Sequence, residues 1–86
     1  MNPAEVISHP LMTESASLMV EKDNKLIFIV SLKAGKGDVK RAVEQLYDVK
    51  VDKVTMLITS QGEKKAFVKL KPEYKASDVA IKLGIL

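Results

Sequence analysis

Two periods of apolar residues alternate along the chain, and they mark the expected strands and helices. Four segments show the short apolar or alternating runs that are typical of β-strands: residues 5–8, 25–32, 51–59 and 64–70. Three segments carry apolar residues at spacings of three and four, as amphipathic helices do: residues 14–22, 37–49 and 78–83. The chain is therefore expected to run strand, short helix, strand, helix, hairpin, helix.

The helix expected over residues 37–49 has the clearest pattern. Its apolar stripe comprises Val39, Ala42, Val43, Leu46 and Tyr47. Burial of the three larger aliphatic side chains should contribute roughly 1.5–3 kcal/mol each. Asp38 lies in the first turn, where a negative charge favours the helix dipole. The solvent side of the helix is expected to carry Lys36, Lys40, Arg41 and Glu44.

Capping residues predict the ends of the two shorter helices. Thr13 should cap the helix over residues 14–22, and Ser77 should cap the last helix. Gly84 is the expected left-handed stop of that last helix. Ile85 and Leu86 can then fold back on it.

The strand patterns predict which strand is central. Residues 25–32 are apolar on both faces, with Leu26, Phe28, Val30 and Leu32 on one and Ile27 and Ile29 on the other. Such a strand is covered on both sides, so it should lie inside a sheet. The hairpin around Gly62 can insert its second strand between the two parallel members of a strand–helix–strand unit. The predicted fold is thus α+β, a four-stranded, mainly antiparallel, ferredoxin-like sheet packed with helices.

Length and composition limit the chain further. The 86 residues, at 9.5 kDa, suffice for one domain, over residues 1–86. The 47% hydrophobic and 29% charged residues are typical of a globular protein. The absence of cysteine excludes disulfides and cysteine-ligated metals and favours a reducing, intracellular location. No apolar run approaches the roughly 18 residues of a membrane span, and residues 1–10 lack the pattern of a signal peptide.

Candidate catalytic residues are sparse. His9 is the only histidine, and its neighbour Ser8 should point to the other face of a strand, so the two form no dyad. No second histidine is available for a metal site. The glycine segment at residues 34–37 is too short for a phosphate loop. The sequence therefore predicts neither an enzyme nor a cofactor.

Basic residues are concentrated in the middle of the chain. Residues 31–71 hold ten basic and five acidic residues, a balance of +5, whereas residues 1–30 carry −2. Such asymmetry is typical of a protein that binds a polyanion, although a solvated lysine surface explains it about equally well. The candidate RNA-binding residues by charge are Lys33, Lys36, Lys40, Arg41, Lys50, Lys53, Lys64, Lys65, Lys69 and Lys71. Phe67 is the only good stacking candidate, so phosphate and shape contacts to folded RNA are expected rather than base stacking on single strands.

Five segments together span nearly the whole chain: VISHPLMTE, NKLIFIV, KGDVKRAVEQLYDVKVDKV, GEKKAFVKL and ASDVAIKLGIL. In these segments the chain resembles the universal large-subunit ribosomal protein L23 family from end to end. Each is weak alone, but their order, spacing and coverage are specific. The short hairpin and the absence of an N-terminal extension resemble the archaeal branch.

The resemblance implies a function that composition does not give. Family members bind large-subunit ribosomal RNA, lie at the rim of the polypeptide exit tunnel beside other ribosomal proteins, and offer a docking surface for the signal recognition particle and the translocon. A cytoplasmic, ribosomal location without membrane insertion follows. The family's RNA-binding segments correspond here to Lys36, Lys40 and Arg41, to Lys50, Lys53 and Thr55, and to Lys64 and Lys65.

Two departures from the family pattern affect site residues. Ser15 stands where the family usually has the lysine of a Thr-Glu-Lys motif, so that RNA contact is reduced at most to a hydroxyl–phosphate bond. The family's asparagine before threonine is also displaced, since Val54, Thr55 and Met56 occupy this segment.

Two further interpretations accompany the resemblance. Glu14, Glu21 and Asp23 form an acidic segment that could dock a basic partner while RNA takes the basic residues. A small regulatory domain of split β-α-β type is the alternative function, and it would show a concave, mostly apolar pocket. An acylphosphatase-like enzyme is a more distant alternative, because the sole arginine, Arg41, is expected within a helix.

Overall fold

Helices and strands follow one another in the expected order, with one additional helical turn at the start. The computed structural model describes residues 2–84, so the expected fold-back of Ile85 and Leu86 lies outside the described residues. The elements are α1 (Pro3–Val6), β1 (Ile7–Pro10), α2 (Glu14–Asp23), β2 (Lys25–Val30), α3 (Lys36–Tyr47), β3 (Val51–Ile58), β4 (Lys64–Leu70) and α4 (Ala76–Leu83).

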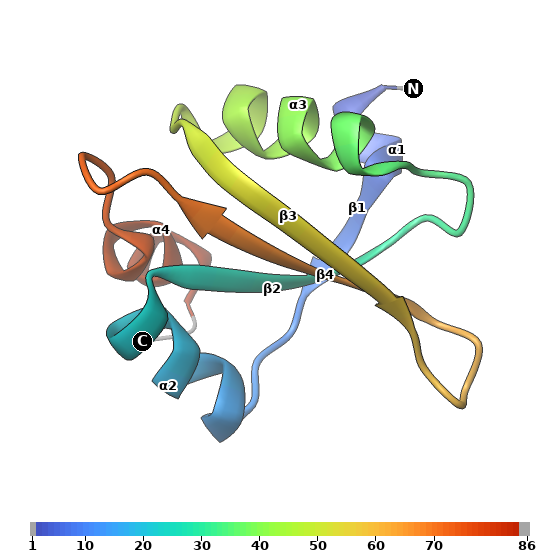
Figure 1. Ribbon diagram of the computed structural model, residues 1–86, viewed down its shortest axis with the longest axis horizontal. Helices are drawn as coiled ribbons and strands as arrows, with labels where there is room; N and C mark the ends of the chain where they lie inside the picture. The colour runs from blue at the N-terminus through green and yellow to red at the C-terminus, as the bar shows by residue number, and fades with distance from the viewer. Residues whose placement is uncertain (1, 85–86) are drawn as a thin grey trace.

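The four strands form one sheet in the order β1-β2-β4-β3, and every neighbouring pair is antiparallel. Strand β4 therefore lies between β2 and β3, which run parallel to each other (Figure 1). This arrangement confirms the predicted split β-α-β topology and the α+β fold. It also confirms that β2 is central, and it makes β1 and β3 the edge strands.

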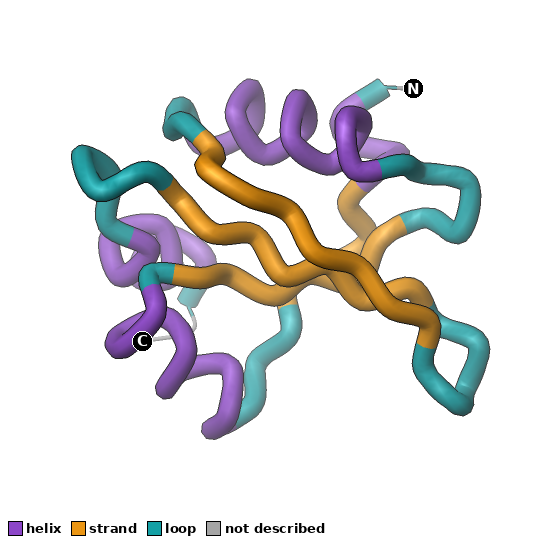
Figure 2. The backbone as a smooth tube through the Cα atoms, viewed as in Figure 1, coloured by secondary structure: helices purple, strands orange, loops and turns teal. Residues whose placement is uncertain are grey.

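The helices lie in two groups (Figure 2). Helix α1 contacts α3 along the top of the view, and α3 also packs on β3. Helix α2 contacts α4 at the lower left, and both reach β2. The flank of β3 beside α3 is thus where a helix and an edge strand meet.

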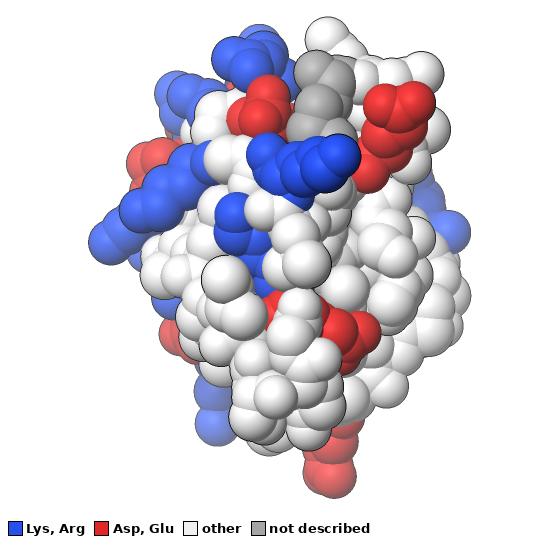
Figure 3. Space-filling model, turned by 90° about the vertical axis from the view of Figure 1, so that its right-hand side faces the viewer, with Lys and Arg blue, Asp and Glu red and all other residues white. Residues whose placement is uncertain are grey.

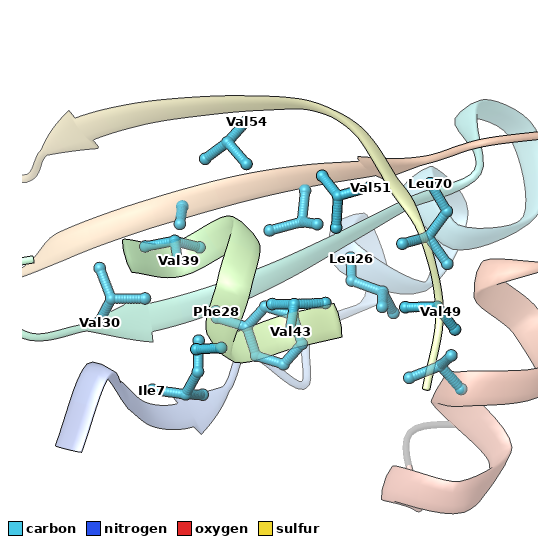
Figure 4. Close-up of a cluster of buried hydrophobic side chains, with 14 of the residues drawn as sticks. Ile7, Leu26, Phe28, Val30, Val39, Val43, Val49, Val51, Val54 and Leu70 are labelled. Atoms are coloured by element: carbon cyan, nitrogen blue, oxygen red, sulfur yellow. The ribbon is translucent and has the colours of Figure 1, made fainter. Parts of the chain in front are cut away.

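One face of the sheet forms the core with the helices (Figure 4). Phe28 on β2 is fully buried, and its ring stacks on Tyr47 of α3 with ring centroids 5.7 Å apart. Burial raises the pKa of the Tyr47 hydroxyl. Ile27 and Ile29, on the other face of β2, are only 5% and 7% exposed, so this strand is covered on both sides as predicted.

The N-terminal strand prediction was wrong in its position. Residues 3–6 form a helical turn because Asn2 caps it, its side-chain oxygen accepting from the amide of Ala4 at 3.0 Å, and Pro3 occupies the first helical position. The strand begins only at Ile7.

The prediction that Ser77 caps the last helix was also wrong. Helix α4 begins at Ala76, and the backbone amide of Ala76 donates to the side-chain oxygen of Asn24 at 2.7 Å. Asn24 itself ends α2 in the left-handed conformation. A residue more than fifty positions earlier therefore caps α4. The other caps were predicted correctly: Thr13 accepts from the amide of Ala16, and Gly84 is left-handed.

Three side chains lie differently from their predicted positions. Leu46 is 45% exposed, because Tyr47 and Val49 complete the core at the end of α3. Leu32 follows the end of β2 and is 60% exposed. Glu44 is only partly exposed, and its carboxylate accepts from the amide of Val51, which fixes the start of β3 on α3.

Candidate nucleic-acid interface

The strand register aligns three lysines on the face of the sheet opposite the core. Lys69 of the central strand β4 lies directly opposite Lys25 of β2 on one side and Lys53 of β3 on the other. Side chains alternate along strands, and the neighbours of these lysines, Leu26 and Val68, are buried in the core. The lysines therefore lie in one row on the outer face.

A groove beside the edge strand brings further lysines to Lys53. It has a volume of about 300 Å³ and lies between the first turns of α3 and the start of β3. Lys36, Lys40 and Lys53 line it, together with Asp52 and nonpolar residues. Lys36 and Lys40 are one helical turn apart, so they share a side of α3.

Lys50 and Lys71 lie next to each other at the same end of the sheet. The amide of Lys71 donates to the carbonyl oxygen of Lys50 at 3.0 Å, and both residues are exposed. Seven lysines thus surround the first half of β3, and we call them the basic band. They are Lys25, Lys36, Lys40, Lys50, Lys53, Lys69 and Lys71.

The basic band has no acidic partners. Within residues 2–84 the single ion pair joins Arg41 and Asp38, so the ammonium groups of the band lie more than 4 Å from carboxylates. Like charges opposite each other on neighbouring strands are unfavourable. The free chain therefore keeps a concentration of positive charge that an anion would relieve. Figure 3 looks at the molecule from the side where the β3–β4 hairpin lies in Figure 1, and on this side too basic side chains outnumber acidic ones in the upper and left parts.

Arg41 has a different environment from its lysine neighbours. Its guanidinium donates to one oxygen of Asp38 at 2.9 Å, while the other oxygen accepts from the amide of Gly35 at 3.0 Å. The Gly35 hydrogen bond, followed by that from Arg41, holds the pKa of Asp38 below its usual value despite some desolvation. Asp38 thus both closes the first turn of α3 and neutralises Arg41.

The hairpin lysines lie at the other end of the sheet. Lys64 directs its ammonium into the loop before α3, donating to the carbonyl oxygens of Ala34 at 2.8 Å and Leu32 at 3.3 Å. Lys65 is partly exposed on the outer face, and Lys33 is exposed in the loop after β2. The structure therefore places Lys64 and Lys65 at the opposite end of the sheet from Lys50 and Lys71, and it gives Lys64 two hydrogen bonds within the protein.

Sequence reasoning missed Lys25 because it precedes the basic segment and lies in the acidic first third of the chain. Only the register of β2 against β4 brings it beside Lys69. Thr55, predicted as a contact, is exposed on the outer face of β3, opposite Phe67.

The predicted acidic docking residues all lie exposed on α2. Glu14 and Glu21 are seven residues apart and share a side of the helix, with Leu18 between them and 46% exposed. Asp23 is two residues beyond Glu21, which turns it about 200° around the helix axis. The structure thus brings Glu14 and Glu21 together and sends Asp23 to the opposite side.

Other hollows of the molecule are shallow and charged. One of about 250 Å³ includes Arg41, Glu44, Asp48 and Lys50, and one of about 180 Å³ includes Glu73, Lys75 and Asp78 among its lining residues. Their linings mix polar and nonpolar surface, whereas the groove beside the edge strand has the mostly nonpolar lining that a regulatory domain would show, although three lysines border it.

Two further searches cover the described part of the chain, residues 2–84. No group of three histidine, cysteine, aspartate or glutamate side chains there could hold a metal ion. None of its helices has both the length and the apolar character that crossing a bilayer requires.

The comparison with known families agrees with the resemblance seen in the segments of the sequence. A match to the family described as Ribosomal protein L23 spans residues 5–83, which includes all seven lysines of the basic band and the whole sheet. Proteins of this family are structural components of the ribosome rather than enzymes, and they associate with ribosomal RNA and other ribosomal proteins. The chain belongs to the ribosomal protein L23 family and is a structural protein of the large ribosomal subunit.

Proposed function

We propose that residues 1–86 act as one RNA-binding domain that holds large-subunit ribosomal RNA through the basic band, close to the polypeptide exit tunnel. The observation that carries this proposal is the convergence of seven lysines around β3 with no carboxylate within 4 Å of them in the described residues. Lysine–phosphate contacts release counterions, so they give affinity that falls steeply with salt. Such contacts position the protein on folded RNA without reading its sequence.

The groove lysines give a direct test of the RNA-binding proposal. We expect the triple variant Lys36→Gln, Lys40→Gln and Lys53→Gln to bind a large-subunit RNA fragment more weakly. The slope of log affinity against log salt should fall by roughly 0.7–0.9 for each lysine–phosphate pair that the variant can no longer form, about 2–3 in all. Binding would be measured by filter retention over a range of salt concentrations.

A matched control removes the same charge elsewhere. Lys22, Lys75 and Lys82 are exposed and lie outside the basic band. Their triple change to glutamine should leave the slope within the error of the wild type. Equal reductions of the slope in the two triple variants would show that net charge rather than the groove determines binding, and would refute the assignment of the interface.

We expect Arg41 and the hairpin lysines to contribute less to RNA binding than the groove lysines, because of where their side chains lie. Arg41 can contact a phosphate while it keeps its bond to Asp38, because its side chain is 69% exposed. Lys64 would have to leave two carbonyl oxygens first. Lys33 and Lys65 remain available at the hairpin end, so a second, weaker RNA contact there is part of the proposal.

The docking function belongs to α2 in this proposal. Glu14, Leu18 and Glu21 form a stripe of two carboxylates around an exposed leucine, on a helix that carries none of the basic band. A partner with basic and apolar side chains, such as the signal recognition particle or the translocon, would be complementary to it. Charge complementarity of this kind acts mainly on association rate and salt dependence.

The docking proposal is tested on assembled ribosomes. Glu14→Lys with Glu21→Lys should slow binding of the signal recognition particle, most strongly at low salt, whereas Asp23→Lys on the opposite side of α2 should have little effect. Incorporation of each variant into large subunits is checked by sedimentation. If the double variant and Asp23→Lys behave alike, the stripe is not the docking surface.

The location near the tunnel can be tested because the chain has no cysteine. A single Ser15→Cys on α2 or Gln45→Cys on α3 gives a unique, exposed site for a cross-linker. The proposal expects cross-links to a short nascent chain or its factors from residue 15 and none from residue 45. Cross-links from residue 45 alone would contradict it.

A further inference from the structure

The outer face of the sheet is open over β3 and β4 and covered over β2. Thr55 and Leu57 of β3 are exposed and Phe67 of β4 is partly exposed, whereas Ile27 and Ile29 of β2 are buried. The register sets these residues in rows across the strands. The rows are Lys25–Lys69–Lys53, Ile27–Phe67–Thr55 and Ile29–Lys65–Leu57.

An aromatic ring therefore lies next to a row of three cations. Phe67 is flanked along its own strand by Lys65 and Lys69, each about 7 Å away at two residues' rise. Neighbouring strands are about 4.8 Å apart, so the row of lysines extends for about 10 Å. No carboxylate in residues 2–84 lies within 4 Å of these ammonium groups.

This combination matches the chemistry of single-stranded nucleic acid. A nucleobase can stack on an aromatic side chain, while the backbone follows a positively charged surface. Stacking on aromatic side chains of a sheet is a common way to bind unpaired RNA bases. An acidic polypeptide would satisfy the lysines but would leave the position of the aromatic ring unexplained.

We propose that the outer face of β3 and β4 binds unpaired nucleotides of RNA, with a base stacked on Phe67 and the adjoining phosphates held by Lys25, Lys53 and Lys69. This inference rests on the proposed RNA-binding function and adds a second mode of contact to it. The groove beside α3 holds the backbone of folded RNA, and the open sheet takes bases that are free of a duplex.

The experiment uses the full chain and a fluorescently labelled oligoadenylate of about ten nucleotides, a length in the range of known single-strand sites. Anisotropy should show that Phe67→Leu binds this probe about 5- to 150-fold more weakly, the effect of removing one stacked base. Phe67→Tyr keeps an aromatic ring and should bind like the wild type. Lys25→Gln with Lys69→Gln should lower the salt slope by about 0.7 for each phosphate that is no longer neutralised.

Two further measurements test the inference without the Phe67→Leu variant, in case that variant does not fold. Nuclear magnetic resonance of the wild type should show ring-current shifts of adenine protons on binding. A blunt RNA duplex should give no such shifts on binding, since a duplex offers no free base to this face.

Three outcomes would overturn the inference. The first is binding of oligoadenylate that Phe67→Leu and the double lysine variant leave unchanged. The second is the absence of ring-current shifts on saturation with the probe. The third is binding of polyglutamate that equals that of oligoadenylate, which would assign the face to an acidic protein partner. The proposed function would survive all three if binding of the large-subunit RNA fragment still depends on Lys36 and Lys40.

Discussion

Replacement of Asn24 should show how strongly its side chain stabilises the fold by joining the end of α2 to the segment before α4. Asn24 ends α2 in the left-handed conformation, with φ of 55°. Its amide nitrogen donates to the carbonyl oxygens of Leu70 at 3.2 Å and Tyr74 at 2.9 Å, and its oxygen accepts from the amide of Ala76 at 2.7 Å. One side chain thus joins the turn before β2 to the segment between β4 and α4.

The magnitude follows from these bonds and from the backbone. Three hydrogen bonds at about 0.5–1.5 kcal/mol each give a loss of roughly 1.5–4.5 kcal/mol for Asn24→Gly, which keeps the left-handed turn. Asn24→Ala should cost about 1 kcal/mol more, because alanine also strains this backbone conformation. Either loss is a large fraction of the stability of a domain of this size, which is roughly 4–13 kcal/mol.

The free energy of unfolding of both variants is measured by urea unfolding followed by circular dichroism. Asp48 supplies the control, because it has the same φ of 55° and no side-chain hydrogen bond within residues 2–84. Asp48→Gly should leave stability nearly unchanged or raise it slightly. A loss below about 0.5 kcal/mol for Asn24→Gly, or an Asn24→Ala variant more stable than Asn24→Gly, would refute this reasoning.

Three other predictions follow from the core and from the entry to α3. Phe28→Ala should lower the free energy of unfolding by about 3–5 kcal/mol, because the ring is fully buried; a loss below about 1 kcal/mol in urea would contradict its place in the core. The pKa of Asp38 is lowered, so its stabilising effect is complete above the ordinary value of 3.8 and is lost as pH falls through the lower folded value. Asp38→Asn should therefore flatten the acid side of the urea-midpoint profile, and an unchanged profile would speak against the bonds to Gly35 and Arg41. Lys64→Met should destabilise the chain by about 1 kcal/mol while leaving the salt slope of RNA binding unchanged, since its ammonium is bound to the protein; a fall in the slope would instead make Lys64 an RNA contact.

The sheet was predictable because its determinants are local. The apolar pattern of residues 25–32 identified the central strand, which ends two residues earlier at Val30, and the alternation of residues 64–70 gave the bounds of β4. Local signals can also be overlooked: Asn2 and Pro3 are a cap and a first helical residue, but the apolar Val6 and Ile7 favoured a strand there. The start of α4 was beyond local reasoning, because its cap, Asn24, comes from the far side of the sequence.

The candidate site was predictable in composition but not in arrangement. Charge counting identified the middle of the chain, and the helical spacing placed Lys36 and Lys40 together. It could not show that Lys25 lies beside Lys69, which depends on strand register. It also could not show that Lys64 is held by the loop before α3, since those partners lie some thirty residues away in sequence.

Lysine footprinting on the RNA complex tests the central claim most directly. The protein is acetylated with a lysine-selective reagent, free and bound to a large-subunit RNA fragment, and the modified positions are read by mass spectrometry. The account predicts that RNA protects the basic band, above all Lys36, Lys40, Lys53 and Lys69, and leaves Lys22, Lys75 and Lys82 reactive. Protection of Lys22, Lys75 and Lys82 with an unprotected band would place the RNA on the other side of the molecule and contradict the account.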